Sequence, residues 1–143
     1  MKIEDKEFKF SFPIQVRWSD LDALGHVNNA VFATYFEIAR GVYMLTAAKT
    51  WDWHKHMFLI GNINIDFKKE ILLTSKDVKV YVRTSKIGTK SFVLEYAIVS
   101  TKNDENVVHA MGTTTQIMFD MAQKSTVEVY DWLRNDLSDF DGI

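Results

Sequence analysis

The sequence has no cysteine and a single proline among its 143 residues. Without cysteine, a disulfide framework, a thiolate nucleophile and a cysteine-ligated metal are all excluded. No uninterrupted run of A, V, I, L, M, F, W or Y is longer than four residues, which is too short to cross a bilayer. The 17 basic and 19 acidic residues leave a net charge of only −2, so no strong field attracts nucleic acid or an acidic membrane. We therefore expect a cytoplasmic protein that binds neither nucleic acid nor a membrane.

Hydrophobic residues make up 47% of the chain and aromatic residues 13%, which is enough material for one sizeable core. The length lies within the roughly 100–200 residues that are usual for one folded unit. No internal repeat, low-complexity tract or linker divides the chain. We expect residues 1–143 to form a single domain.

Hydrophobic periodicity predicts both strands and helices. Apolar residues occupy every second position from Phe8 to Trp18, which predicts a long strand with one buried face. Pro13 falls on the polar face of that strand and favours an edge position or a bulge. Residues 30–48 have apolar positions at helical spacing and are apolar nearly all round, so we expect a helix surrounded by protein. Four further strands are expected around 62–67, 77–83, 92–99 and 107–119, and an amphipathic helix over 125–138.

The order of these elements indicates the architecture. The segments 85–90 and 101–106 have the composition and length of hairpin connections, so successive strands pair antiparallel. A single antiparallel sheet must cover its apolar face, and the only large apolar partner is the helix 30–48. We expect an α+β fold in which an antiparallel sheet wraps around one long central helix, with a short helix at the C-terminus.

The loop 19–29 places several reactive side chains directly before this helix. Asp20, Asp22 and His26 lie within seven residues of one another. Backbone N–H groups near Asn28 to Val31 lack intrahelical acceptors and form a positive end that can hold a developing oxyanion. A carboxylate beside such donors can hydrolyse an activated acyl group without metal or thiol. Aspartate and asparagine also have ordinary turn and capping roles, and the residue types alone leave both interpretations open.

Residues 16–40, VRWSDLDALGHVNNAVFATYFEIAR, resemble the signature of hotdog-fold acyl-CoA thioesterases of the 4-hydroxybenzoyl-CoA thioesterase type. That pattern is a strand, then D-x-D-x-x-G-(H/x)-V, then a helix with Y-F-E-x-A-R. The stretches 83–96 and 112–120 look like the family's R-x-x-x-I-G-x-x-S-F hairpin and its closing strand. The resemblance covers nearly the whole chain and implies a hotdog fold.

The resemblance also implies an activity and a set of roles. Asp22 matches the family's catalytic carboxylate, and Asn29 matches the position whose backbone N–H holds the oxyanion. The expected reaction is hydrolysis of an acyl-CoA thioester, with Asp22 acting as nucleophile or as general base. No cofactor and no metal are expected, since CoA belongs to the substrate. Hotdog proteins usually place the active site between subunits, so we expect a homodimer or a homotetramer.

Several alternatives to these roles remain open. His26 matches a similar stretch of plant acyl-ACP thioesterases, D-x-N-x-H-V-x-N, although Leu24 stands where they have asparagine. His26 either orients water or substrate, or bonds the loop backbone. Asp20 is the second catalytic candidate, and a capping carboxylate is its alternative. Glu37, three residues before Arg40, is either a helix catalytic group, or part of a structural ion pair or a subunit contact.

Basic and aromatic clusters offer candidate binding residues. Arg83, Lys86 and Lys90 bracket the expected hairpin and would suit the phosphates of coenzyme A, with an ordinary solvated face as the alternative. Lys68 and Lys69 carry further positive charge on another segment. Either an acyl tunnel or ordinary core packing would account for four apolar residues, Trp51, Trp53, Met57 and Phe58. The connector also carries Asp52, His54 and His56, which are too few ligands for a convincing metal site.

Two other functions compete with acyl-CoA hydrolysis. An acyl-ACP thioesterase would share the loop and helix machinery. A non-catalytic acyl-binding hotdog protein would keep the fold without turnover. The hotdog hydratases and dehydratases fit the DLDALGHVNN stretch poorly, because they place a histidine and a carboxylate differently.

Overall fold

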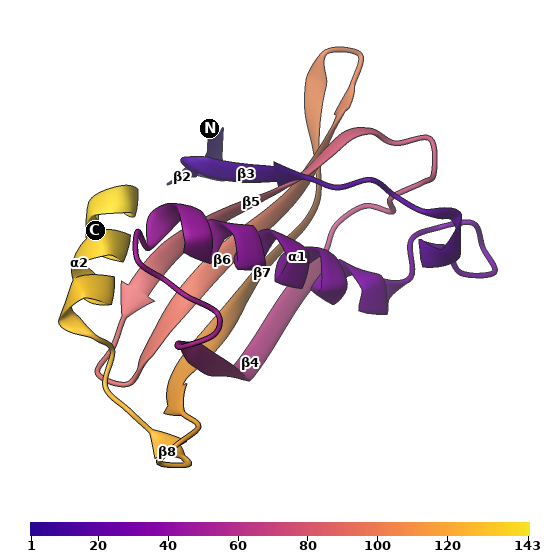
Figure 1. Ribbon diagram of the computed structural model, residues 1–143. Coiled ribbons are helices and arrows are strands. Elements are labelled where there is room, and N and C mark those ends of the chain that lie inside the picture. Colours follow the sequence, from indigo (N-terminus) through magenta and orange to yellow (C-terminus); the bar gives the residue numbers. More distant parts are fainter.

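The computed structural model describes all 143 residues, Met1–Ile143, and shows an antiparallel sheet that curls around one long helix (Figure 1). The main sheet has the order β3-β5-β6-β7-β4, and the short β8 also pairs with β7. Its strands are β3 (Phe10–Pro13), β4 (Met57–Phe67), β5 (Lys76–Ile87), β6 (Ser91–Lys102), β7 (Glu105–Asp120) and β8 (Ser125–Thr126). A separate small hairpin at the N-terminus joins β1 (Lys2–Ile3) to β2 (Lys6–Glu7). The expected α+β architecture is confirmed.

The central helix α1 runs over Asn29–Ala47, close to the predicted range 30–48. It starts there because the Asn28 side chain accepts a hydrogen bond from the Ala30 N–H at 2.9 Å, which caps the first turn. One face of the helix, including Phe32, Phe36 and Tyr43, is buried against the sheet. The 3.6-residue period of the apolar positions therefore predicted the helix correctly.

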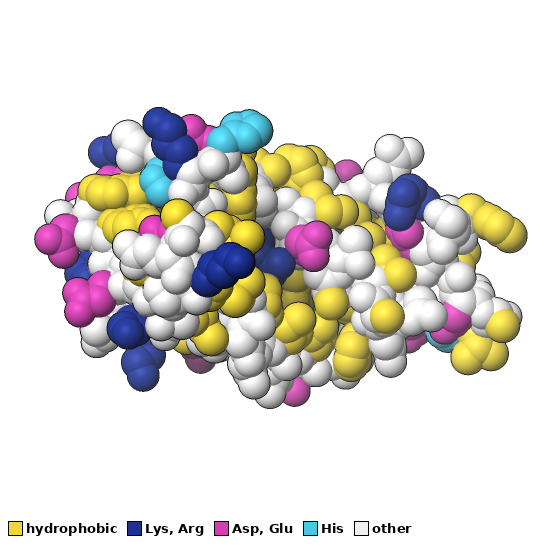
Figure 2. All heavy atoms as spheres, turned by 60° about the horizontal axis from the view of Figure 1, so that its bottom comes forward, with side chains coloured by type: hydrophobic (Ala, Val, Ile, Leu, Met, Phe, Trp, Pro, Cys, Tyr) yellow, Lys and Arg dark blue, Asp and Glu magenta, His cyan; other side chains and the backbone are white.

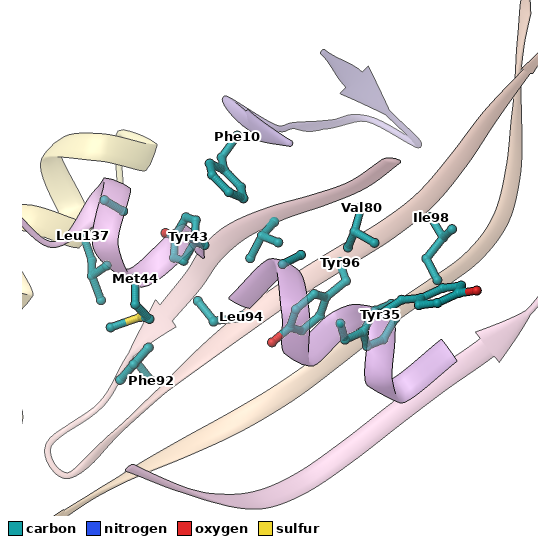
Figure 3. Close-up of a cluster of buried hydrophobic side chains, with 14 of the residues drawn as sticks. Phe10, Tyr35, Tyr43, Met44, Val80, Phe92, Leu94, Tyr96, Ile98 and Leu137 are labelled. Carbon is teal, nitrogen blue, oxygen red and sulfur yellow. The ribbon is translucent and has the colours of Figure 1, made fainter. Parts of the chain in front are cut away.

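The core lies between α1 and the concave face of the sheet. Phe92, Leu94 and Tyr96 follow one another along β6 beneath the helix (Figure 3). The Tyr96 ring stacks on Phe36 with 4.2 Å between ring centroids. Gly112 permits this packing, because a Cβ there would lie 2.5 Å from the Phe36 ring and 2.6 Å from the Asn64 carbonyl oxygen. Complete burial of a side chain such as Phe36 stabilises the folded state by about 1.5–3 kcal/mol.

The N-terminal strand is shorter than its alternating pattern predicted. Pro13 ends β3, which is an edge strand, so the expected edge position of Pro13 is confirmed. The expected continuation to Trp18 is wrong. Trp18 begins a 3₁₀ turn, η1 (Trp18–Asp20), and is 80% exposed. The Ile14 N–H still bonds Val78 O at 2.8 Å, but the Arg17 N–H bonds the Asp20 carboxylate at 3.0 Å instead of a neighbouring strand.

The C-terminal helix α2 spans Asp131–Asp141, later than the predicted 125–138. The intervening chain stays extended because Val127 N–H bonds Met118 O and Val129 N–H bonds Thr89 O. The helix packs against β5, and the Tyr43 hydroxyl of α1 donates to the Asp141 carboxylate. α2 thus lies beside the C-terminal end of α1, near the β5–β6 turn (Figure 1).

One side of the molecule leaves apolar surface open. On α1, Ile38 and Leu45 are exposed, so the expectation of a helix surrounded on all sides is wrong for the single chain. On the free edge strand β4, Ile63 and Phe67 are about half-exposed. Hydrophobic side chains gather on this face in Figure 2. No helix in the chain is both long enough and apolar enough to cross a membrane.

Candidate active site

The loop before α1 folds into a tight hairpin-like turn. The Gly25 N–H bonds the Asp22 carbonyl at 3.1 Å, and the Asp22 N–H bonds the His26 carbonyl at 2.8 Å. Gly25 has a φ of +79°, which glycine adopts without the steric penalty of other residues. Aspartate at the first position and glycine at the fourth are the residues that a type I turn favours. Sequence and geometry therefore agree on a rigid turn.

This turn is fixed to the rest of the protein from two sides. The Val27 N–H bonds Ile71 O at 2.8 Å, and His26 forms a bridge with Leu72, so the β4–β5 connection supports it. The Asn28 N–H bonds Asp20 O at 2.9 Å. Each contact uses backbone atoms, so the turn holds its place at the start of α1 whatever its exposed side chains do.

The Asp22 carboxylate is oriented by one oxygen and open at the other. Its Oδ1 accepts hydrogen bonds from the Leu24 N–H at 2.9 Å and the His26 N–H at 3.2 Å. Its Oδ2 has no partner within the chain, and the residue is exposed in the single chain. The carboxylate is thus held by the turn while one oxygen remains free to meet a substrate or a water.

The first N–H of α1 also has no acceptor. Asn28 accepts hydrogen bonds from the next two backbone N–H groups: its side chain accepts from the Ala30 N–H and its carbonyl from the Val31 N–H. Neither the backbone nor a side chain of this protein accepts a bond from the exposed Asn29 N–H. An unpaired donor at a helix N-terminus attracts negative charge. The structure therefore places a free donor at Asn29 beside the turn that holds Asp22.

The His26 ring makes no hydrogen bond and is partly exposed, so only its backbone takes part in the turn. Its ring nitrogens remain available to a water or a substrate on the same loop as Asp22.

Asp20, the second catalytic candidate, is only 3% exposed and fully engaged. Its Oδ2 accepts from the Arg17 N–H at 3.0 Å and from the Tyr35 hydroxyl at 2.7 Å, and its Oδ1 from the Arg17 guanidinium. Burial alone would raise the pKa of Asp20, but these hydrogen bonds outweigh it and hold the pKa below the ordinary value of 3.8. Asp20 ties the loop to α1 and matches the capping alternative. Tyr35 was missed as its partner, because its place on the apolar stripe of the helix indicated only core packing.

Replacing Asp20 should therefore cost stability. In Asp20→Asn the new amide NH₂ faces hydrogen-bond donors instead of accepting from them. We therefore expect the free energy of unfolding to fall by about 1–3 kcal/mol at neutral pH. Because the folded pKa is depressed, the wild-type carboxylate contributes above pH 3.8, and its contribution is lost as pH falls through the folded value. Urea denaturation at neutral pH and in acid should show the difference between wild type and variant shrinking in acid. A difference independent of pH would contradict the assigned contacts.

The predicted CoA-binding residues lie at the other end of the molecule. Lys86 and Lys90 are located at the β5–β6 turn, and Arg83 bonds Glu95 at 3.2 Å. This turn is held by α2, since Arg134 bonds Gly88 O at 2.9 Å, and α2 lies at the C-terminal end of α1. Asp22 lies at the N-terminal end, and the 19 residues of α1 span about 28 Å. A single chain does not bring the two sets together.

The remaining candidates have structural surroundings. Glu37 is exposed and its carboxylate lies 4.0 Å from the Arg40 guanidinium, and Lys68 bonds Glu4 at 3.0 Å. No three His, Asp or Glu side chains stand close enough to hold a metal ion. Trp51 and Trp53 pack on Phe58 with ring centroids 5.7 and 5.5 Å away, in an aromatic cluster at the start of β4.

An antiparallel sheet curled around one long helix, with a short C-terminal helix, is the hotdog fold of the thioesterase structures that this chain resembles. Residues 16–137 match the thioesterase-like superfamily, and the chain belongs to that family. A sequence relative is YsmA of Bacillus subtilis strain 168, an uncharacterized protein that is 28% identical over 98 residues. That match covers 67% of this chain and 66% of YsmA, so the chain spans just under two thirds of the length of this relative.

Solved structures agree with this family. A thioesterase from Thermus thermophilus, crystallised with coenzyme A and Zn, is 30% identical and has a TM-score of 0.81, covering 95% of this chain and 96% of its own. A thioesterase-superfamily protein from Jannaschia sp. CCS1 is 18% identical with a TM-score of 0.85, covering 95% of this chain and 85% of its own. The second likeness supports the fold alone.

Proposed function

We propose that this protein is an acyl-CoA thioesterase that hydrolyses its substrate with Asp22 and the N-terminus of α1. The observation that carries the proposal is the pairing of two unsatisfied groups at one loop–helix junction: the free Oδ2 of Asp22 and the free N–H of Asn29. A carboxylate can activate the attacking group, and a backbone N–H can hold the oxyanion. Thioester hydrolysis needs both roles and no metal.

The proposed reaction places the thioester carbonyl oxygen at the Asn29 N–H. Asp22 either takes a proton from a water that attacks the carbonyl carbon, or attacks the carbon itself to form an anhydride that water then hydrolyses. In both routes negative charge collects on the carbonyl oxygen, where the helix end stabilises it. The C–S bond then breaks, and CoA thiolate leaves and takes up a proton. His26 stands on the same turn and would orient the water.

The arrangement of the two site halves supports a dimer as the active form. β4 is a free edge strand with exposed Ile63 and Phe67, and an edge of this kind favours pairing with a second copy. Met57 pairs with Phe119 near the β5–β6 turn, whereas Phe67 pairs with Ala110 near the catalytic loop. Antiparallel pairing of two β4 strands about a twofold axis would set the Met57 end of one copy beside the Phe67 end of the other.

Such a dimer would complete the substrate site. The β5–β6 turn of one subunit, with Arg83, Lys86 and Lys90, would approach the Asp22 loop of the other. Guanidinium and ammonium groups are suited to phosphates, and coenzyme A carries several. The bound coenzyme A of the Thermus thermophilus relative supports this choice of substrate. A homotetramer would keep the same pair of subunits as its unit, and a cytoplasmic location would suit a CoA substrate.

A thiol-release assay tests the function directly. Purified protein is mixed with short, long, branched and aromatic acyl-CoAs and with an acyl-carrier-protein thioester, and free thiol is followed with a chromogenic disulfide. The proposal expects multiple turnovers on at least one acyl-CoA, faster than on the same acyl group carried by the protein. Hydrolysis only of the carrier-protein thioester would make the protein an acyl-ACP thioesterase. Binding without turnover would make it a non-catalytic acyl-binding protein.

A further inference from the structure

A buried arginine on α1 leaves most of its hydrogen-bonding capacity unused. Arg40 is 7% exposed, and its Nη1 donates to the Tyr96 hydroxyl at 3.2 Å. Its Nη2 lies 4.0 Å from the Glu37 carboxylate, beyond hydrogen-bond distance. A guanidinium has five N–H donors, and nothing else in the chain accepts from this one. The Glu37 carboxylate offsets part of the charge, but Nη2 and Nε still have no hydrogen-bond acceptor in the chain and are free to bind one.

The arginine faces a small cavity between α1 and the edge of the sheet. The helix contributes Phe36, Glu37 and Arg40 to its lining, and the sheet contributes Ile60, Ile63 and Thr114. Its volume of about 130 Å³ is that of about four liquid water molecules. This is room for the end of an acyl chain, because half of the lining residues are apolar, while Arg40, Glu37 and two threonines supply polar groups.

The polar groups beneath the cavity are satisfied among themselves. The Tyr96 hydroxyl pairs with Thr114 Oγ1 at 2.6 Å, and Thr114 also donates to the Gln116 amide oxygen. The Gln116 Nε2 donates to Phe92 O at 3.0 Å. This network fixes the Tyr96 hydroxyl, and through it the Arg40 guanidinium. The cavity therefore offers spare donors, and a complementary ligand must bring an oxygen that accepts.

The cavity lies on the same helix that begins at the proposed oxyanion donor. α1 rises 1.5 Å per residue and long side chains lean toward its N-terminus, so the Arg40 guanidinium lies about 10–15 Å from the Asn29 N–H along the axis. An acyl chain that starts at Asn29 and follows α1 toward β4 would bring its far end to Arg40. The inference thus rests on the proposed thioesterase function.

We propose that Arg40 determines specificity for acyl groups that carry an oxygen at the end distant from the thioester, as a hydroxyl, an oxo group or a carboxylate. The oxygen accepts from Nη2 and Nε, and the methylenes before it contact Phe36 and Ile60. An unsubstituted acyl chain would displace water from Nη2 and Nε without offering them an acceptor. The protein would therefore discriminate by the cost of those unsatisfied donors.

Matched substrates of equal length test this proposal. We expect the wild type to hydrolyse suberoyl-CoA or 8-hydroxyoctanoyl-CoA with a kcat/KM about 10-fold or more above that for octanoyl-CoA, as expected for a hydrogen bond to a charged group. The same comparison with the shorter adipoyl, 6-hydroxyhexanoyl and hexanoyl thioesters tests how the preference depends on the distance between the thioester and the terminal oxygen. The carboxylated and hydroxylated arms show which oxygen is preferred. A wild type that hydrolyses octanoyl-CoA as well as both oxygenated partners would overturn the proposal.

Arg40→Met keeps the length of the side chain and removes its donors. We expect it to lose the preference, because kcat/KM falls for the oxygenated substrates and rises for octanoyl-CoA, while the oligomeric state is retained. Arg40→Lys retains the charge without the planar fork and should keep part of the preference, which covers the case in which Arg40→Met does not fold. Equal losses on all substrates, together with a change of oligomeric state in gel filtration, would instead assign Arg40 to a contact with a second subunit.

The two proposals can fail separately. If the wild type hydrolyses no acyl-CoA, the proposed function fails, and binding of suberate and of octanoate still tests Arg40. Calorimetry should then show tighter binding of suberate to the wild type and no difference for Arg40→Met. Equal binding of both acids to the wild type would remove the assignment of Arg40 as well.

Discussion

Asp22→Asn should lower the turnover of acyl-CoA hydrolysis by at least about 100-fold, the scale expected when the central acid–base group is removed. The asparagine side chain keeps an oxygen that can accept from the Leu24 and His26 N–H groups, so the turn should survive. The variant loses only the negative charge and the basicity of the second oxygen. Turnover is measured by thiol release at saturating substrate, and folding by circular dichroism and the denaturation midpoint.

Asp120→Asn is a matched control for this substitution. Asp120 also accepts two backbone N–H groups with one oxygen, from Ala122 at 2.8 Å and Gln123 at 3.0 Å, but it lies in the β7–β8 turn. The same chemical change there should leave turnover unaltered. If Asp22→Asn retained wild-type turnover as Asp120→Asn does, the catalytic carboxylate would have to be another one, with Glu37 on α1 the first candidate.

Local patterns in the sequence were sufficient to predict most of the fold. The helical period of residues 30–48, with Asn28 before it, marked α1 because burial and capping are both encoded within a few residues. The turn signals at 85–90 and 101–106 marked the two hairpins for the same reason. The end of β3 was missed because the alternating pattern runs on to Trp18, while the competing bond from Arg17 to Asp20 depends on a turn that alternation does not report.

The candidate site was harder to predict than the fold. Residue types alone left both Asp20 and Asp22 open, and the family resemblance favoured Asp22. The anchoring role of Asp20 depends on its hydrogen bond from Tyr35, fifteen residues away, which the sequence did not reveal. The expected ion pair of Arg40 with Glu37 is present at 4.0 Å, but the hydrogen bond of Arg40 to Tyr96, fifty-six residues away, was not predicted. Contacts across such separations follow from the curl of the sheet, which no local pattern records.

The open face of α1 and β4 gives the second large prediction. Ile63→Lys should convert the protein to a monomer and reduce hydrolysis per chain in parallel. Ile63 is 50% exposed in the single chain, so the substitution costs the subunit little stability. Across a twofold axis it would place two lysines in one apolar contact, and a penalty of several kcal/mol would weaken dimerisation by about 100-fold or more.

The diagnostic result for Ile63→Lys is the concentration dependence. Since the site would need Asp22 from one subunit and the β5–β6 turn from the other, hydrolysis per chain should recover as the concentration of the variant rises. Light scattering should follow the same curve. Ile143→Lys, which changes an isoleucine that is 48% exposed at the C-terminus, should leave both measurements at wild-type values. A monomer with full activity at high dilution would show that one chain holds a complete site. The basic residues of the β5–β6 turn would then have no part in substrate binding, because the length of α1 separates them from Asp22 within a subunit.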